Sequence, residues 1–211
     1  MNWNEPETAV IEISGQHLSG LSLASVLRTR RSRRTLSEAP LEDVAFVVRE
    51  TLRTDFLGAD HNSGRKRKAV VSAGALHPIK GVLIGREPRP LVYDDDGDRF
   101  ISVEVRDRRQ FDEFREACRA VVPTANGHWV ALVADTRELE RLYMHCDSLL
   151  WRDAGAVIQT MAFIAEAAGL AFCPLGILGH QLLRALLPSD PALVALGVVA
   201  IGRSEADQKA S

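Results

Sequence analysis

The sequence has few cysteines, few aromatic side chains and almost no excess of charge of either sign. Its three cysteines, Cys118, Cys146 and Cys173, lie far apart and form no C-x-x-C pair. This pattern excludes a disulfide framework, argues against a thiolate zinc site and favours a reducing, cytoplasmic compartment. The 26 basic and 28 acidic residues give a net charge of −2, so net charge offers no argument for nucleic-acid binding.

Targeting, membrane and metal signals are also missing. The first residues carry no basic region followed by an apolar core, so we expect no secretory signal. The longest apolar run, residues 154–173, contains Gln159, Thr160 and Glu166 and is rich in Ala and Gly, which favours a buried helix over a membrane span. His17, His61, His128 and His180 show no metal-ligand spacing, and we predict no metal site.

The chain is long enough for one substantial domain. Its 211 residues, 46% of them hydrophobic, exclude intrinsic disorder and fit a single core. We interpret residues 1–20 as an extension and 21–211 as one domain. The periodicities predict helices at 21–31, 41–52, 108–121, 153–169 and 181–187, strands at 81–84, 128–133 and 194–201, turns at 86–90, 94–98 and 173–176, a polar loop at 55–68 and a helix cap at Thr136. This alternation indicates one layered α+β domain.

An arginine cluster is the densest charged feature. Arg28, Arg30, Arg31, Arg33 and Arg34 lie within seven residues, with Ser32 among them. Guanidinium groups match phosphate oxygens, and a hydroxyl adds a neutral donor. Three interpretations remain open from these residues: a solvated helix end, a site for a small-molecule phosphate, and a nucleic-acid arm. The near-neutral chain and the lack of interleaved aromatic residues weaken the third.

Three further segments are rich in small residues. Ser72-Ala73-Gly74-Ala75-Leu76-His77-Pro78 would let the backbone approach a flat ligand, although an ordinary loop explains it equally. Asp153-Ala154-Gly155 opens an Ala-rich helix and implies tight helix contacts, either in a core or across a dimer interface. Cys173-Pro174-Leu175-Gly176 offers backbone amides in a tight turn.

Taken in order, these motifs resemble the nitroreductase superfamily of FMN-dependent oxidoreductases. The matching residues are Arg30-Arg31-Ser32-x-Arg34-x-Leu36 before Pro40-Leu41, then Asp153-Ala154-Gly155 and Cys173-Pro174-Leu175-Gly176. The segment from Ser72 to Pro78 is more similar to the SagB-type branch, whose members oxidise azoline rings in thiazole/oxazole-modified peptides. The resemblance implies a layered fold with a mainly antiparallel central sheet flanked by helices. It also implies a homodimer that binds FMN at the subunit interface with residues from both chains.

The resemblance also implies residue roles. Arg30, Arg31, Ser32 and Arg34 would hold the FMN phosphate and ribityl chain, with Arg203 as a further phosphate contact. Ser72, Ala73 and Gly74 would line the isoalloxazine, and Leu175 and Gly176 would meet its reactive edge.

Flavin oxidation also requires a base that removes a proton from the substrate. Tyr143 and His145 are the candidates because they lie just before the predicted 153–169 helix, although either could be structural. His77 is a weaker candidate for a substrate contact.

We therefore expect an FMN-dependent oxidoreductase that dehydrogenates a peptide-derived or other natural-product intermediate, with a biosynthetic partner protein as an additional expectation. Two alternatives stay open: an NAD(P)H-dependent reductase of nitro or quinone compounds, and a flavin-binding subunit without turnover. A nucleic-acid binder built on the arginine cluster is a weaker alternative. We expect neither nucleic acid nor membrane among its partners.

Overall fold

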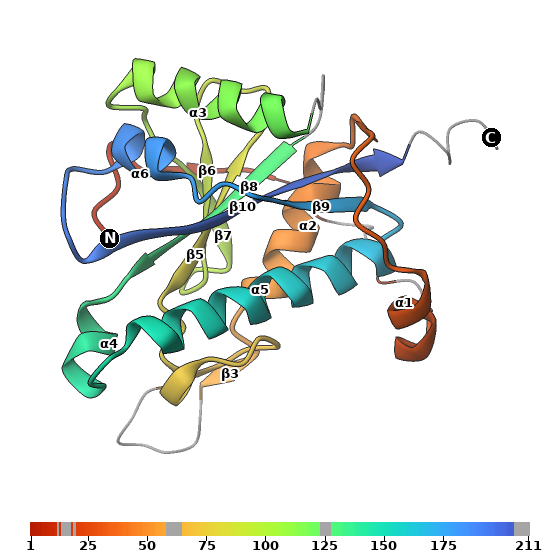
Figure 1. Ribbon diagram of the computed structural model, residues 1–211, viewed down its shortest axis with the longest axis horizontal. Coiled ribbons are helices and arrows are strands. Elements are labelled where there is room, and N and C mark those ends of the chain that lie inside the picture. Colours follow the sequence, from red (N-terminus) through yellow and green to blue (C-terminus); the bar gives the residue numbers. More distant parts are fainter. Residues whose placement is uncertain (12, 14–17, 19, 58–64, 123–127, 205–211) are drawn as a thin grey trace.

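A computed structural model describes residues 1–11, 13, 18, 20–57, 65–122 and 128–204 (Figure 1). A twisted sheet lies between two helical layers, with α2 and α5 on one face and α3 and α6 on the other. The helices are α1 (Leu23–Thr29), α2 (Leu41–Leu52), α3 (Arg108–Val121), α4 (Arg137–Leu142), α5 (Asp147–Ala167) and α6 (His180–Leu186). The predicted layered α+β fold with a mainly antiparallel sheet is confirmed.

The sheet has the strand order β1-β7-β6-β5-β8-β10-β2, and β9 also pairs with β10. All of these pairings are antiparallel. The strands are β1 (Glu7–Ala9), β2 (Leu36–Ser37), β5 (Ile79–Ile84), β6 (Leu91–Asp94), β7 (Arg99–Ser102), β8 (His128–Asp135), β9 (Ala171–Leu175) and β10 (Leu193–Ser204). A separate ladder joins β3 (Phe56–Leu57) to β4 (Lys66–Arg67).

The alternation of side chains along β8 explains the two layers. Val130, Leu132 and Ala134 face the core built with α2 and α5, whereas the intervening residues face the core built with α3 and α6. Every residue from His128 to Ala134 is buried, as expected for a central strand covered on both faces. The sequence pattern there is a continuous apolar run rather than an alternation of apolar and polar residues.

Two predicted elements need correction. Residues 173–176 do not form a turn, because Cys173, Pro174 and Leu175 belong to β9. Proline is tolerated in a strand whose missing N–H faces away from the partner. The long helix begins at Asp147 rather than at Asp153, so the Asp153-Ala154-Gly155 motif lies in its second turn. The end of this helix near Gly169 is confirmed, since Gly169 adopts a φ of 71° just after α5.

Other predictions fail at a finer level. The predicted polar loop at 55–68 contains the β3–β4 ladder, and its residues 58–64 lie outside the described residues. Thr136 stands at the start of α4, but its side chain caps no backbone N–H; its hydroxyl lies within hydrogen-bond distance of the Glu140 carboxylate and the Ala192 carbonyl instead. Within the predicted 1–20 extension, β1 pairs with β7 and the Met1 amine lies 3.6 Å from Asp135.

The C-terminal part of β10 is held close to β2. Arg203 pairs with Ser37 and Ser204 with Leu36. A Cβ atom on Gly202 would overlap the backbone oxygen of Ser37, so only glycine permits this approach. Among the helices of the described residues, none is long and apolar enough to cross a membrane.

Candidate flavin site

The arginine segment follows directly from the end of α1. Ser22 caps the start of this helix by accepting a hydrogen bond from the backbone N–H of Ser25 at 3.2 Å. At the other end, the Arg31 guanidinium donates to the carbonyl oxygens of Arg28 at 2.7 Å and Arg30 at 2.9 Å. Arg31 therefore closes α1, a structural role that the arginine pattern did not predict.

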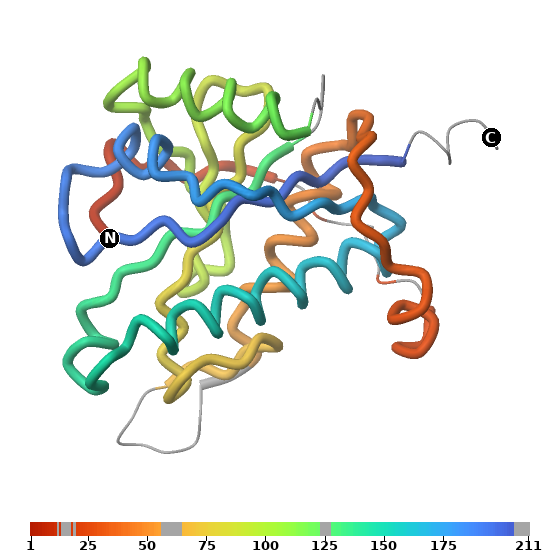
Figure 2. The backbone as a smooth tube through the Cα atoms, viewed as in Figure 1, coloured from red at the N-terminus to blue at the C-terminus, as the bar shows by residue number. Residues whose placement is uncertain are grey.

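The next residues attach the segment to β9. Ser32 forms a parallel bridge with Phe172, and the Arg33 N–H donates to the Phe172 carbonyl at 3.0 Å. The Arg33 guanidinium reaches the Ser204 hydroxyl at 3.2 Å. Figure 2 shows this segment crossing β9 on its way from α1 to α2. Arg33, which the resemblance did not single out, thereby joins the segment to both β9 and β10.

The positive charge of the segment is not compensated. In the parts of the chain that the structure describes, Arg28, Arg30, Arg31 and Arg34 form no ion pair with a carboxylate; the ion pairs of neighbouring elements are Arg86 with Glu38 and Arg203 with Asp43. Burial raises the pKa of the Cys173 thiol on β9, and the adjacent Arg34 opposes that shift. This donor set suits an anionic ligand with several oxygens.

Arg203 and Gly176 lie at different positions along the same pair of strands. The exposed Arg203 guanidinium lies 3.4 Å from Asp43, so a nearby carboxylate partly offsets its charge. Leu175 is buried at the end of β9, whereas Gly176 is exposed with no atom near its Cβ position. The strand β9 thus carries uncompensated guanidinium groups at Phe172 and an open backbone at Gly176, a combination that fits a phosphate-bearing planar cofactor such as FMN.

The small-residue segment, Ser72–Pro78, is attached to the N-terminal half of α5 through Asp153. Ser72 donates its hydroxyl hydrogen to Asp153 at 2.6 Å, and the Ala73 N–H lies 3.2 Å from both Asp153 oxygens. Gly74 adopts a φ of 58°, and its carbonyl accepts a hydrogen bond from Arg65. Neither Asp153 nor Arg65 was predicted as a site residue. Asp153 lies 81 residues from Ser72, so no local sequence pattern connects the two.

Of the two predicted bases, Tyr143 lies at this segment. A Cβ atom on Gly74 would overlap the Tyr143 hydroxyl, so the phenol packs directly on the glycine backbone. Tyr143 is partly buried at the end of α4. His145 is exposed in the turn before α5, with a φ of 56°. The structure therefore brings Tyr143, and not His145, against the predicted isoalloxazine-lining residues.

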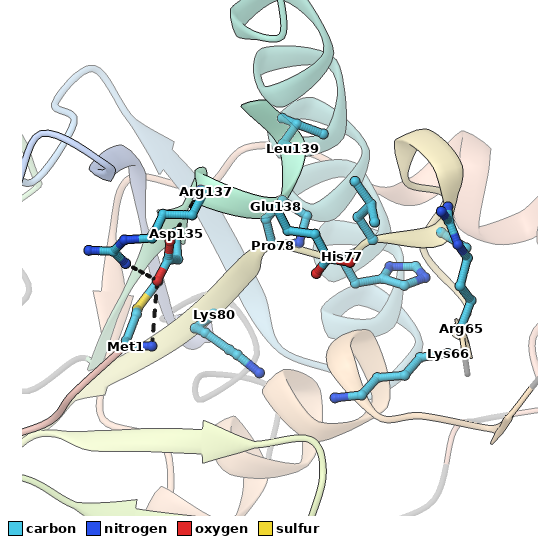
Figure 3. Close-up of a pocket in the computed structure, with 12 residues that line it drawn as sticks. Met1, Arg65, Lys66, His77, Pro78, Lys80, Asp135, Arg137, Glu138 and Leu139 are labelled. Carbon is cyan, nitrogen blue, oxygen red and sulfur yellow. Dashed lines mark hydrogen bonds and ion pairs between the residues drawn. The ribbon is translucent and has the colours of Figure 1, made fainter. Parts of the chain in front are cut away.

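A cavity of about 410 Å³ opens beside the same segment (Figure 3). His77, Arg65 and Lys66 lie on one side of it, and Asp135 with Arg137 on the other. Its lining is Met1, Arg65, Lys66, Ala75, Leu76, His77, Pro78, Lys80, Asp135, Arg137, Glu138 and Leu139. Polar groups converging on a concave surface are typical of a substrate site.

A lysine cluster borders this cavity, since Lys66 and Lys80 line it. The Asp95 carboxylate, 2% exposed, binds Lys66 at 2.7 Å, Lys68 at 2.6 Å and also Lys80. These cations hold the pKa of Asp95 well below its usual range against the effect of burial. Asp94 and Asp96 lie close to Asp95, but they pair with Arg99 and Lys66. All three carboxylates thus already have cationic partners, and we assign no metal to them.

The two groups of predicted residues lie at opposite ends of α5. Ser72 and Ala73 contact Asp153, whereas Ser32 contacts Phe172, in the strand that follows the helix. The helix between Asp153 and Ala167 is about 21 Å long. In Figure 1, α1 lies at the C-terminal end of α5, and β3 lies near its N-terminal half. A single chain therefore gathers each group but does not join the two.

Structural comparison relates this architecture to solved proteins assigned as nitroreductases. A Ralstonia eutropha JMP134 protein assigned as a nitroreductase matches 97% of this chain and 99% of its own, with a TM-score of 0.65 and 14% identity. The chain has the nitroreductase fold. A Desulfovibrio desulfuricans protein with this fold, also assigned as a nitroreductase and solved in complex with FMN, matches 86% of both chains with a TM-score of 0.55 and 20% identity.

The nitroreductase fold also occurs in a biosynthetic assembly. A chain of the E. coli microcin synthetase McbBCD complex, solved with truncated pro-MccB17 bound, covers 93% of this chain and 78% of its own. Its TM-score is 0.63 at 13% identity. No protein-family model matches the sequence, and no curated protein matches it either. The predicted resemblance to nitroreductases is confirmed at the level of the fold.

The half-buried position of His77 generates a prediction about its charge. Burial lowers the pKa of His77, and the positive charge of Lys68 lowers it further. The imidazole is therefore neutral at pH 7, and the stability that the neutral form contributes is lost as the pH falls below the ordinary histidine value of about 6.5. We expect Lys68→Met to raise the pKa of His77, measured by NMR titration of the imidazole.

The matched control for this titration is Arg67→Met, which removes an exposed charge one residue earlier. Asp95 keeps Lys66 and Lys80 in the Lys68→Met protein, so the fold should persist. A His77 titration midpoint that stays constant or falls in Lys68→Met would contradict the assignment.

Proposed function

We propose that this protein is an FMN-dependent oxidoreductase that acts as a homodimer. The observation that carries the proposal is the uncompensated arginine segment fixed at Phe172 on β9, the strand that ends at the open backbone of Gly176, in a chain with the nitroreductase fold. When bound, FMN would supply the hydride acceptor. Arg30, Ser32 and Arg34 would bind its phosphate and ribityl chain, with Arg203 as a further phosphate contact.

Substrate chemistry would take place at the segment from Ser72 to Gly74. Ser72, Ala73 and Gly74 would line the isoalloxazine, and Leu175 with Gly176 would meet its reactive edge. Tyr143 is the better placed of the two predicted bases; as the phenolate, its Oη would accept the substrate proton and become the neutral hydroxyl. The cavity beside His77 would hold the substrate and exclude water from it.

The direction of reaction that we favour is dehydrogenation of a peptide-derived or other natural-product intermediate. Two observations support it: the similarity to a chain of the microcin synthetase complex and the contact of Tyr143 with Gly74. The same similarity supports a biosynthetic partner protein. A second candidate, an NAD(P)H-dependent reductase of nitro or quinone compounds, is supported by the similarity to proteins assigned as nitroreductases.

A homodimer would unite the two groups of residues that one chain separates. α5 carries an exposed stripe formed by Ser148, Trp151, Arg152, Gly155 and Gln159, at the spacing of a single helix face. Trp151 is 46% exposed. If two such stripes pack antiparallel about a two-fold axis, the arginine segment of one chain approaches Ser72–Gly74 of the other. Leu142 and Met144, also exposed, would extend this contact.

Cofactor binding is tested with Arg30→Gln. The Arg30 side chain has no hydrogen-bond or ion-pair partner among the described residues, so the substitution should leave the fold intact. We expect purified wild-type protein to release about one FMN per chain on denaturation. The variant should bind FMN about tenfold or more weakly, because a hydrogen bond to a charged group contributes about 1.5–3 kcal/mol. Fluorescence titration of the apoprotein measures this change.

The control for Arg30→Gln is Arg106→Gln, which removes an exposed arginine charge beside α3. Equal FMN affinity in wild type and Arg30→Gln would refute the phosphate assignment. A wild-type protein that neither contains nor binds FMN would refute the proposed function itself.

The dimer is tested with Gly155→Leu. Nothing lies within 4 Å of the Gly155 Cβ position, and leucine favours helix over glycine by up to about 1 kcal/mol. The isolated chain should therefore keep or gain stability. The dissociation constant of the dimer should rise, and FMN affinity should fall. Sedimentation velocity over a concentration series measures this, with the exposed Ala120→Leu on α3 as control. An unchanged dimer in Gly155→Leu would exclude this face of α5.

The two candidate reactions differ in their response to reduced nicotinamide. A dehydrogenase that uses oxygen to reoxidise its flavin should keep the oxidised flavin spectrum when NADH or NADPH is added anaerobically. A reductase should lose the flavin absorbance within one turnover. Anaerobic stopped-flow spectroscopy at 450 nm (about the usual flavin maximum) distinguishes the two, and rapid bleaching would overturn the direction that we favour.

A further inference from the structure

The Asp153 carboxylate is an unusual feature of the core on the α2 and α5 face. It is 7% exposed, among apolar neighbours that include Leu150 and Val157. Within the described residues it has no cationic partner; its hydrogen bonds come from Ser72 and Ala73. A buried carboxylate without a cation is costly unless several donors bind it. An apolar side chain would fill this position at lower cost, so packing alone does not explain the acid.

The hydrogen bonds of Asp153 extend across the whole segment from Ser72 to His77. Ser72 donates to Asp153 at 2.6 Å, and the same hydroxyl oxygen accepts the His77 N–H at 3.0 Å. The Ala73 N–H lies 3.2 Å from both carboxylate oxygens. The start and the end of the segment are therefore bound to one side chain of α5, directly at Ser72 and Ala73 and through the Ser72 hydroxyl at His77.

The backbone that these bonds enclose is strained. Gly74, Ala75 and His77 adopt φ values of 58°, 55° and 49°. Such a conformation costs of order 1–3 kcal/mol for each residue other than glycine, and it persists only where the surroundings impose it. Ala75 and His77 line the cavity, and Gly74 packs against the Tyr143 hydroxyl. The strain is thus located at the residues that face the proposed reaction space.

We propose that Asp153 is a positioning residue, whose carboxylate holds Ser72–His77 in the strained conformation that presents this segment to the flavin ring. The inference rests on the proposed function for the identity of the ring, whereas the restraint itself rests on hydrogen bonds within the chain. Asp153 touches neither cofactor nor substrate in this proposal. It acts through the Ser72 hydroxyl and the Ala73 amide.

Two variants test the restraint at separate atoms. Asp153→Asn keeps the shape of the side chain but replaces one acceptor oxygen with an amide donor. Ser72→Ala leaves the carboxylate in place and removes the hydroxyl that joins it to His77. Ser72→Thr retains the hydroxyl and should therefore behave like the wild-type protein. The matched control is Asp147→Asn, an exposed carboxylate in the first turn of the same helix.

The first readout is amide hydrogen exchange at Ala73 and His77, which requires no cofactor. We expect exchange at these amides to accelerate about tenfold in Asp153→Asn and, at His77, in Ser72→Ala, the equivalent of losing about 1.4 kcal/mol. Exchange at core positions such as Met161 should stay at the wild-type rate. The second readout is FMN affinity together with the visible circular dichroism of the bound flavin, and both should change in the same two variants and recover in Ser72→Thr.

The outcomes separate the inference from the function on which it rests. Wild-type exchange and wild-type flavin signals in Ser72→Ala would overturn the inference. Faster exchange at every core amide in both variants would also overturn it, because Asp153 would then serve global stability. If the wild-type protein binds no FMN, the proposed function fails whatever the exchange rates are. If it binds FMN and the variants match it, only the positioning role fails.

Discussion

Strand β10 is the element on which the rest of the structure depends. One edge pairs with β8 from Leu193 to Ile201, and the other pairs first with β9 and then with β2. Because β9 also bridges to Ser32, the position of the arginine segment is fixed through two successive strand pairings. The close approach at Gly202 keeps the last of these pairings tight. The position of the arginine segment thus depends on sheet hydrogen bonds, as the Ser32–Phe172 bridge and the β9–β10 pairing show.

The second constraint is the length of α5. A helix that runs under the whole sheet gives the protein a core, but it also separates the guanidinium groups near Phe172 from the Ser72–Gly74 segment at Asp153. Sequence order does not reveal this separation, since both groups look like parts of one ligand site. The symmetric pairing of two chains that we propose would resolve it without any change in the chain's own fold, because one face of α5 is exposed.

The sequence predicted the layers well where periodicity and burial agree. Helix α3 has one apolar face and strand β8 is a continuous apolar run, and both features indicate burial in a core. Both elements were predicted at nearly the correct bounds. The strand at Cys173–Leu175 was missed because proline normally interrupts a strand ladder. Pro174 is tolerated because, among the described strands, β9 pairs along its length with β10 alone. The short strands β2, β3 and β4 have two residues each, which is too few for any pattern to register.

The candidate site was predictable as a set of residue types and not as a network. Arginines near a hydroxyl indicate an anion site from local sequence alone. The contacts that give the site its shape are Asp153 with Ser72, Arg65 with Gly74 and Arg33 with Ser204, and they join positions 81, 9 and 171 residues apart. Sequence spacing carries no information on such pairs unless the fold is already known.

The net charge of the chain gives no sign of an anion site, whereas the local charge of the arginine segment does, and the structure explains the difference. Acidic residues are numerous, but many of them are paired with cations far from α1, as Asp95 is with its three lysines. The arginines after α1 lack such carboxylate partners in the described chain, so their field persists although the chain as a whole is slightly negative. A field confined to one segment suits a single phosphate group. A nucleic acid would require basic residues distributed over a much longer face, and the compensated lysines near the cavity do not extend the arginine segment in that way.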